Sequence, residues 1–159
     1  MIRYCPHCWR EIDLNAPVCS HCQRATEEDG KDFVSKLLSA LRHPEPTRAG
    51  LAIDILTQRL HESRAVEPLL DLLTTARDYD ILAQAARGLG LLGDSRAIPP
   101  LADLLTDPSK PLIARREAAF ALGKLGGEEA ARALSQALSD PSQAVAEAAW
   151  EAHDALKPK

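Results

Sequence analysis

The sequence predicts an all-α protein, a solenoid of stacked helical pairs with a small cysteine-rich module at its N-terminal end. Similar segments begin at His61, Gly93 and Gly126, at spacings of 32 and 33 residues. Repeats of this length are typical of solenoids, because one helical pair cannot bury its apolar face alone. Leucine and alanine dominate the last two thirds of the chain, and aromatic residues make up only 4%. All four cysteines lie between Tyr4 and Cys22.

The cysteines form two Cys-x-x-Cys pairs, with ten residues between the pairs. Each pair can present two sulfurs to one metal ion from a tight turn, and four sulfurs complete the tetrahedron that suits Zn²⁺. The connecting segment is too short to form its own core, so the metal must supply most of the folding energy, on the order of 10–16 kcal/mol. We therefore predict one structural Zn²⁺ per chain, bound by Cys5, Cys8, Cys19 and Cys22.

This stretch resembles a bacterial zinc ribbon that opens with Tyr-Cys-Pro-x-Cys and returns with Ala-x-x-Cys-x-x-Cys. The residues that carry the resemblance are Tyr4, Cys5, Pro6, Cys8, Ile12, Ala16, Cys19 and Cys22. The resemblance implies a closed site of four cysteines with no open coordination position. Where that family favours glycine after the second and fourth cysteines, this chain has Trp9 and Gln23. Trp9 either covers the zinc site or contacts a partner, and His7 and His21 are expected to be exposed residues that do not bind the metal.

Three segments follow from the pattern: a zinc ribbon at residues 1–24, a polar linker at 25–31 and a helical solenoid at 32–159. The linker is rich in charge and contains glycine. Apolar residues recur three and four positions apart in the solenoid, which indicates helices. The expected helices span about 31–42, 48–60, 64–75, 80–92, 96–106, 112–125, 129–139 and 142–156.

Each repeat unit contains a first and a second helical stretch. Ile81–Gly93 and Ile113–Gly126 are first helices, and each closing glycine suits a left-handed cap. The second helix of one unit begins near Ser95, a candidate N-cap, and has Pro99 and Pro100 in its first turn, where proline costs least.

The repeated pattern "ALG/GLG…LGD…RAI-P-L…LL-DP" resembles the short HEAT-like repeats named for phycobilin (PBS) lyases. The resemblance covers roughly Asp32 to Leu156, although Gln58, Arg59 and His61 replace the glycine-rich end in the first full copy. It implies an α-solenoid whose second helices line the concave side. It implies little about activity, because this fold carries many functions.

The core is expected to form from leucines that interlock along the stack. These are Leu37, Leu38, Leu41, Leu69, Leu70, Leu73, Leu101, Leu105, Leu134 and Leu138. Phe120 in "REAAFA" and Trp150 in "AEAAWE" occupy equivalent positions in the sequence and are expected to pack in the core. Gly88 and Gly90 are expected to be packing glycines inside a helix, since they follow no strand.

The exposed ridge of the second helices is the candidate partner surface, with plain solvated surface as the alternative. With Trp9, the predicted contact residues are Lys36, Glu67, Asp71, Asp103, Arg132 and Gln136; Ser35, Ser39, Pro68, Pro99, Pro100 and Ala133 complete the ridge. Its acidic centre favours a protein partner of some basic character over an anionic ligand.

The remaining features argue against catalysis and against nucleic acid. The formal net charge is −4, with no basic stripe. No phosphate loop is present, and His43, His61 and His153 lie far apart in the chain, where exposure to solvent is expected. No apolar stretch reaches the ~18 residues of a membrane span, and no export signal is seen, which predicts a cytoplasmic protein. We expect a non-enzymatic adaptor for a protein or a larger assembly; the alternatives are a nucleic-acid-associated zinc-ribbon protein and a subunit of a bilin lyase-like enzyme.

Overall fold

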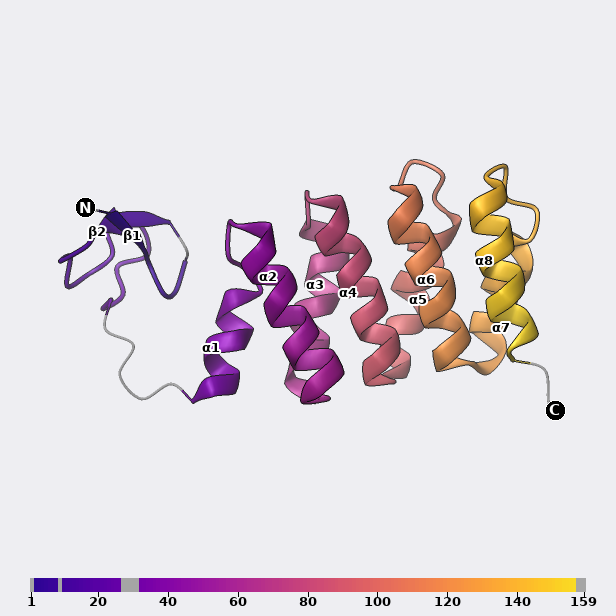
Figure 1. Ribbon diagram of the computed structural model, residues 1–159, viewed down its shortest axis with the longest axis horizontal. Helices are drawn as coiled ribbons and strands as arrows, with labels where there is room; N and C mark the ends of the chain where they lie inside the picture. Colours follow the sequence, from indigo (N-terminus) through magenta and orange to yellow (C-terminus); the bar gives the residue numbers. More distant parts are fainter. Residues whose placement is uncertain (1, 9, 27–31, 157–159) are drawn as a thin grey trace.

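The computed structural model describes residues 2–8, 10–26 and 32–156 of the 159-residue chain. A small ribbon at the N-terminal end contains the antiparallel strands β1 (Ile2–Tyr4) and β2 (Glu11–Asp13). The helices follow as an elongated stack that runs away from the ribbon (Figure 1). Trp9 and residues 27–31 of the predicted linker lie outside the described residues.

Eight α-helices within the described residues form two rows. The first-helix row contains α2 (Pro46–Asp54), α4 (Tyr79–Leu92), α6 (Leu112–Leu125) and α8 (Gln143–Asp154). The second-helix row lies behind it in Figure 1 and contains α1 (Phe33–Ala40), α3 (Val66–Thr75), α5 (Ile98–Thr106) and α7 (Gly127–Ala137). The predicted all-α solenoid of paired helices is confirmed.

Local sequence explains where these helices begin. The Asp78 carboxylate accepts hydrogen bonds from the backbone N–H groups of Asp80 and Ile81, which caps α4. A 3₁₀ turn, Ser95–Ala97, leads into α5, and its cap is Asp94 rather than the predicted Ser95. Asp94 is the better acceptor because its carboxylate bonds both the Arg96 N–H and the Arg96 guanidinium.

The first full repeat departs from the predicted straight helix over residues 48–60. A π-helical turn, Ile55–Arg59, follows α2, and a 3₁₀ turn, Ser63–Ala65, precedes α3. The π turn adds one residue, so His61 takes the place that Gly93 has one repeat later. Both residues have left-handed φ angles, 48° for His61 and 73° for Gly93. The imidazole of His61 compensates for the missing glycine, since its Nδ1 lies 2.7 Å from the Thr57 carbonyl oxygen.

Glycine and alanine set the spacing of the first-helix row. A β-carbon on Gly90 would lie only 2.7 Å from the β-carbon of Ala121, and one on Gly123 would lie 2.9 Å from that of Ala152. Real side chains do not approach so closely, so these glycines let α6 pack on α4 and α8 pack on α6. The predicted packing role of Gly90 is confirmed, and Gly88 meets Thr57 in the same way.

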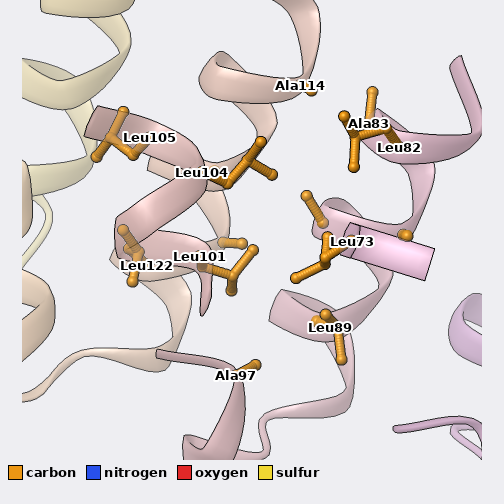
Figure 2. Packing of buried hydrophobic residues seen from close by; sticks show 14 of the residues in the cluster. Leu73, Leu82, Ala83, Leu89, Ala97, Leu101, Leu104, Leu105, Ala114 and Leu122 are labelled. Atoms are coloured by element: carbon orange, nitrogen blue, oxygen red, sulfur yellow. The ribbon is translucent and has the colours of Figure 1, made fainter. Parts of the chain in front are cut away.

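The core lies between the two rows and runs the length of the stack. Figure 2 shows Leu73, Leu89, Leu101 and Leu122, from α3, α4, α5 and α6, pointing into one apolar interior. The predicted leucines are buried or pack against this cluster, apart from Leu138. That side chain is 38% exposed, so its predicted core position is wrong. Leu138 follows the last turn of α7, and no further pair covers it within the described residues.

The predicted core position of Trp150 is also wrong, since its side chain is 62% exposed. Phe120 is partly buried against the core, as predicted. Sequence similarity aligns the two residues, but the packing does not. Ala152 sits on Gly123 as Ala121 sits on Gly90, which sets α8 against α6 at a spacing of 31 residues. Trp150 therefore corresponds to the fully buried Ala119, on a face of α8 that no other helix covers within the described residues.

His43 contradicts the expectation of an exposed histidine, because it is 6% exposed in the loop between α1 and α2. Its Nδ1 accepts the backbone N–H of Glu45 at 3.0 Å, and burial together with nearby Arg48 lowers its pKa. Its ring contacts Tyr4 of the ribbon edge to face, with ring centroids 5.2 Å apart. None of the described helices is sufficiently long and apolar to cross a membrane.

Candidate metal centre and contact surfaces

Two similar turns position the four cysteines. The Cys5 N–H donates to the Arg10 carbonyl and the Cys19 N–H donates to the Arg24 carbonyl, each at 2.9 Å. In each turn the backbone N–H two residues further on points at the first sulfur: His7 N–H to Cys5 Sγ at 3.4 Å, and His21 N–H to Cys19 Sγ at 3.3 Å. Backbone donors of this kind stabilise negative charge on sulfur, which prepares both turns for a cation.

The sulfur atoms form a compact cluster. Cys5 Sγ lies 3.7 Å from Cys22 Sγ, Cys8 Sγ lies 3.7 Å from Cys19 Sγ, and all four lie within 4.8 Å of one another. A disulfide needs about 2.05 Å, and none is formed among them. Four ligands at the usual zinc–sulfur length of about 2.3 Å occupy tetrahedron corners about 3.8 Å apart. The spacing therefore fits one tetrahedral metal ion.

The surroundings give the thiols unequal proton affinities. Backbone N–H groups of Cys22 and His21 lower the pKa of Cys19 to about 6 against the effect of burial. The Arg10 backbone lowers the pKa of Cys8, but burial and hydrogen bonds with the other sulfurs outweigh it and raise that pKa to about 11. Without metal, Cys19 therefore loses its proton more readily than Cys8. A metal ion removes the remaining protons, because the thiolate is the ligand.

In the described part of the ribbon, the buried apolar cluster consists of cysteines and one isoleucine. Ile12 on β2 is 6% exposed and packs with Cys5 and Cys19 in a buried cluster separate from that of the solenoid. His7 is half-buried rather than exposed as expected, and its Nε2 lies 2.8 Å from the Ala25 carbonyl oxygen. His21 is exposed, as expected. The cysteines therefore make up most of the buried apolar cluster of the described ribbon.

Gln23, which stands where related ribbons favour glycine, has a left-handed φ of 58°. A non-glycine residue in this conformation costs about 1 kcal/mol or more. We expect Gln23→Gly to strengthen Zn²⁺ binding roughly fivefold, equivalent to about 1 kcal/mol. Competition with a chelator measures this change. Gln23→Ala is the control, because it removes the bond from the Gln23 amide to the Ser20 carbonyl but keeps the strain; equal affinities for the two variants would refute the strain argument.

The structure places the predicted contact residues of the solenoid on the surface of the second-helix row. Lys36, Glu67, Asp71, Asp103, Arg132 and Gln136 are all exposed. Ala133, predicted on the same ridge, is 4% exposed and belongs to the core, because its methyl group is on the inner side of α7. Trp9 lies outside the described residues.

Ion pairs within the chain already engage two of the three ridge carboxylates. Arg96 contacts Glu67, and Arg42 lies 3.6 Å from Asp71. Asp103 forms no ion pair within the part of the chain that the structure describes. Both pairs are largely exposed, so each contributes at most about 1 kcal/mol and a partner's cation can replace the arginine.

The first-helix row carries grooves that were not predicted from the repeat pattern. An apolar groove of about 370 Å³ is bordered by Phe120, Gly123 and Lys124 of α6 and by Ala152 of α8. A smaller polar groove of about 220 Å³ lies between α4 and α6, beside Gln84, Arg87 and Glu117. They exist because the small residues that set the helix spacing leave hollows between longer neighbours. Repeat periodicity alone does not indicate such hollows.

Comparison with known proteins agrees with this architecture. The model of the family described as HEAT repeats matches residues 34–116, and that of the PBS lyase HEAT-like repeat matches residues 114–140. The chain belongs to the HEAT repeat family. No curated protein sequence matches the chain.

A solved structure, human deoxyhypusine hydroxylase in complex with glycerol, superposes with a TM-score of 0.65 at 23% identity. The match covers 83% of this chain and 47% of the hydroxylase, so the chain spans about half the length of that protein. At this identity the likeness concerns the fold.

Proposed function

We propose that the protein is a non-catalytic adaptor, in which a zinc ribbon and the solenoid surface each contact a protein partner. The cysteine cluster carries the first half of the proposal: sulfurs 3.7 Å apart suit a closed ZnS₄ site, which holds a shape and has no position for a reacting water. Within the described residues, these cysteines are also the only side chains that form a candidate metal-binding group. Unpaired thiols suit a reducing compartment, so we place the protein in the cytoplasm.

The second half of the proposal rests on the exposed, mixed-charge ridge of the second-helix row. Two weak contacts joined by a linker gain affinity through effective concentration, which gives the ribbon a role beside a solenoid that already has its own core. Trp9 on the ribbon and Asp71 and Asp103 on the ridge are the proposed contacts. A tryptophan in a contact commonly contributes about 2 kcal/mol or more.

Charge reversal on the ridge tests this proposal. Asp71→Lys with Asp103→Lys should weaken capture of the partner purified with the protein from its own cells by about tenfold, or about 1.4 kcal/mol. Trp9→Ala should weaken it independently and leave the zinc content unchanged. Asp80→Lys with Glu147→Lys makes the same charge change on the first-helix row and should have little effect. Equal losses in the two double variants would point to net charge rather than to the ridge.

A further inference from the structure

Within the described residues, no first helix covers the N-terminal end of the first-helix row, although the same helix face is covered in every later repeat. Gln84 of α4 packs on Gly50 of α2, Ala121 of α6 packs on Gly90 of α4, and Ala152 of α8 packs on Gly123 of α6. Each first helix therefore presents one face to the first helix before it. No first helix precedes α2 within the described residues, because α1 is a second helix without its partner.

The repeat register identifies the residues on that uncovered face. Counting back 33 residues from Gln84 gives Leu51, and counting back 33 from Gly88 gives Ile55. Leu51 is 62% exposed and Ile55 is half-buried. The equivalent residue to Leu51 in α6 is the polar Glu117. An isolated exposed leucine is ordinary, but this one lies where the repeat interface would continue.

Two arginines border the apolar positions. Arg48, Leu51, Ile55 and Arg59 follow one another at spacings of three and four, which places them along one side of the helix. Arg48 pairs with Glu45 at 2.8 Å, but both side chains are at least half exposed, so that pair is readily exchanged. Arg59 is exposed and forms no ion pair within the described part of the chain. Arg48 and Arg59 therefore flank the two apolar positions along α2 and the π turn that follows it, whereas Asp54, Asp78 and Asp80 line the groove between α2 and α4 that Leu51 also borders.

We propose that an acidic amphipathic helix of a partner protein packs along α2, in the place of the first helix that α1 lacks. Its apolar stripe covers Leu51 and Ile55, and carboxylates near its two ends pair with Arg48 and Arg59. The contact continues the interface that already joins α2 to α4 and α4 to α6. The inference rests on the proposed interaction function and adds a third surface, distinct from the ridge.

Peptide binding to the full-length, zinc-loaded protein tests the proposal. The probes are three fluorescent helical peptides: one with a leucine–alanine stripe flanked by glutamates, one with the same stripe flanked by lysines, and one with serines in the stripe. The glutamate peptide should bind at least about tenfold more tightly than either of the others. Arg59→Glu should weaken the glutamate peptide and strengthen the lysine peptide. Equal binding of all three, or no change with Arg59→Glu, overturns the proposal.

Leu51→Glu should weaken the glutamate peptide at least about tenfold. Trp150→Glu is the matched control, because Trp150 is also 62% exposed but lies on α8, at the other end of the stack. It should leave binding unchanged; a greater loss with Trp150→Glu than with Leu51→Glu overturns the assignment. The peptide tests do not involve the ridge. A negative result would therefore overturn the contact on α2 and leave the proposed adaptor function standing.

Two further measurements exclude other occupants of this face. The melting temperature of Leu51→Glu should stay within about 2 °C of the wild type, since the side chain is exposed. A larger fall would mean that the chain's own ribbon covers Leu51, against the proposal. Sedimentation should show a monomer for both proteins; a wild-type dimer that Leu51→Glu dissociates would make a second copy the occupant.

Discussion

Asp140→Ala is expected to lower the free energy of unfolding by about 3–5 kcal/mol, because it leaves the Arg115 guanidinium buried without a counter-charge. The two side chains are only 8% and 5% exposed. Arg115 also donates its Nε–H to the Leu105 carbonyl at 2.9 Å, and Asp140 accepts the Ser142 N–H at 2.9 Å. The pair thus joins the end of α5, the start of α6 and the loop before α8. Urea unfolding followed by circular dichroism measures the loss.

The previous repeat supplies a matched control for this variant. Asp107 occupies the same place in its "DPS" motif and accepts the Ser109 N–H at 2.9 Å, but it forms no ion pair within the described residues. Asp107→Ala should therefore cost only about 1 kcal/mol, the loss of a local hydrogen bond. If the two variants lose the same stability, the buried pair does not contribute as described.

The same pair predicts a pH dependence. Burial raises the pKa of Asp140, but the hydrogen bonds from Arg115 and Ser142 outweigh burial and hold the pKa below its ordinary value. A lowered folded-state pKa means that the stabilisation is present above the unfolded pKa, about 3.9, and is lost as the pH falls through the folded value. The stability difference between wild type and Asp140→Ala should therefore shrink below about pH 4. A difference that grows on acidification would contradict this sign.

Cys19→Ser is expected to abolish metal binding and to unfold the chain as far as about Thr26, while the helices remain. Metal supplies on the order of 10–16 kcal/mol in modules of this size, which three cysteines and one buried isoleucine cannot replace. The solenoid should keep its helical circular dichroism and main melting transition, because its buried cluster shares no residue with that of the ribbon. Native mass spectrometry should give one Zn²⁺ per wild-type chain and none for the variant.

His21→Ala is the control for the cysteine variant, since His21 lies between two cysteines but is exposed and outside the sulfur cluster. It should keep one Zn²⁺. A wild-type stoichiometry near zero, or a Cys5–Cys8 disulfide, would contradict the metal centre. A large loss of helix in Cys19→Ser would show that the solenoid needs the ribbon, through contacts such as that of Tyr4 with His43.

The features that follow from residue spacing could be predicted from the sequence. The cysteine spacing indicated a common cluster, and the 32–33-residue repeat indicated the helical pairs and the packing glycine Gly90. Burial was predicted wrongly for residues at the two ends of the stack. Trp150 belongs to an apolar pattern, but no helix of the described chain covers it, and His43 is polar yet buried at the other end. A pattern along one helix does not show which of its faces is covered.

The candidate contact surface was only partly predictable for a related reason. The exposure of Asp71 and Asp103 follows from the helical register. The ion pair of Asp71 with Arg42 connects residues far apart in the sequence, so the local sequence does not predict it. The importance of Leu51 emerges only after the packing of Gln84 on Gly50 fixes which face of α2 lacks a neighbour. The π turn at Ile55–Arg59 was also not predicted. It accommodates one more residue before His61 than the later repeats have before the equivalent glycine.

In the proposed function, the ribbon and the solenoid contact the same partner assembly as two linked sites. The most direct test compares capture of the native partner by the full-length protein and by residues 32–159, at equal concentration and with zinc present. We predict that the solenoid alone captures the partner at least about tenfold more weakly, and that adding the separate ribbon does not restore capture, because effective concentration is lost with the linker. Equal capture by the solenoid alone would contradict the two-site claim.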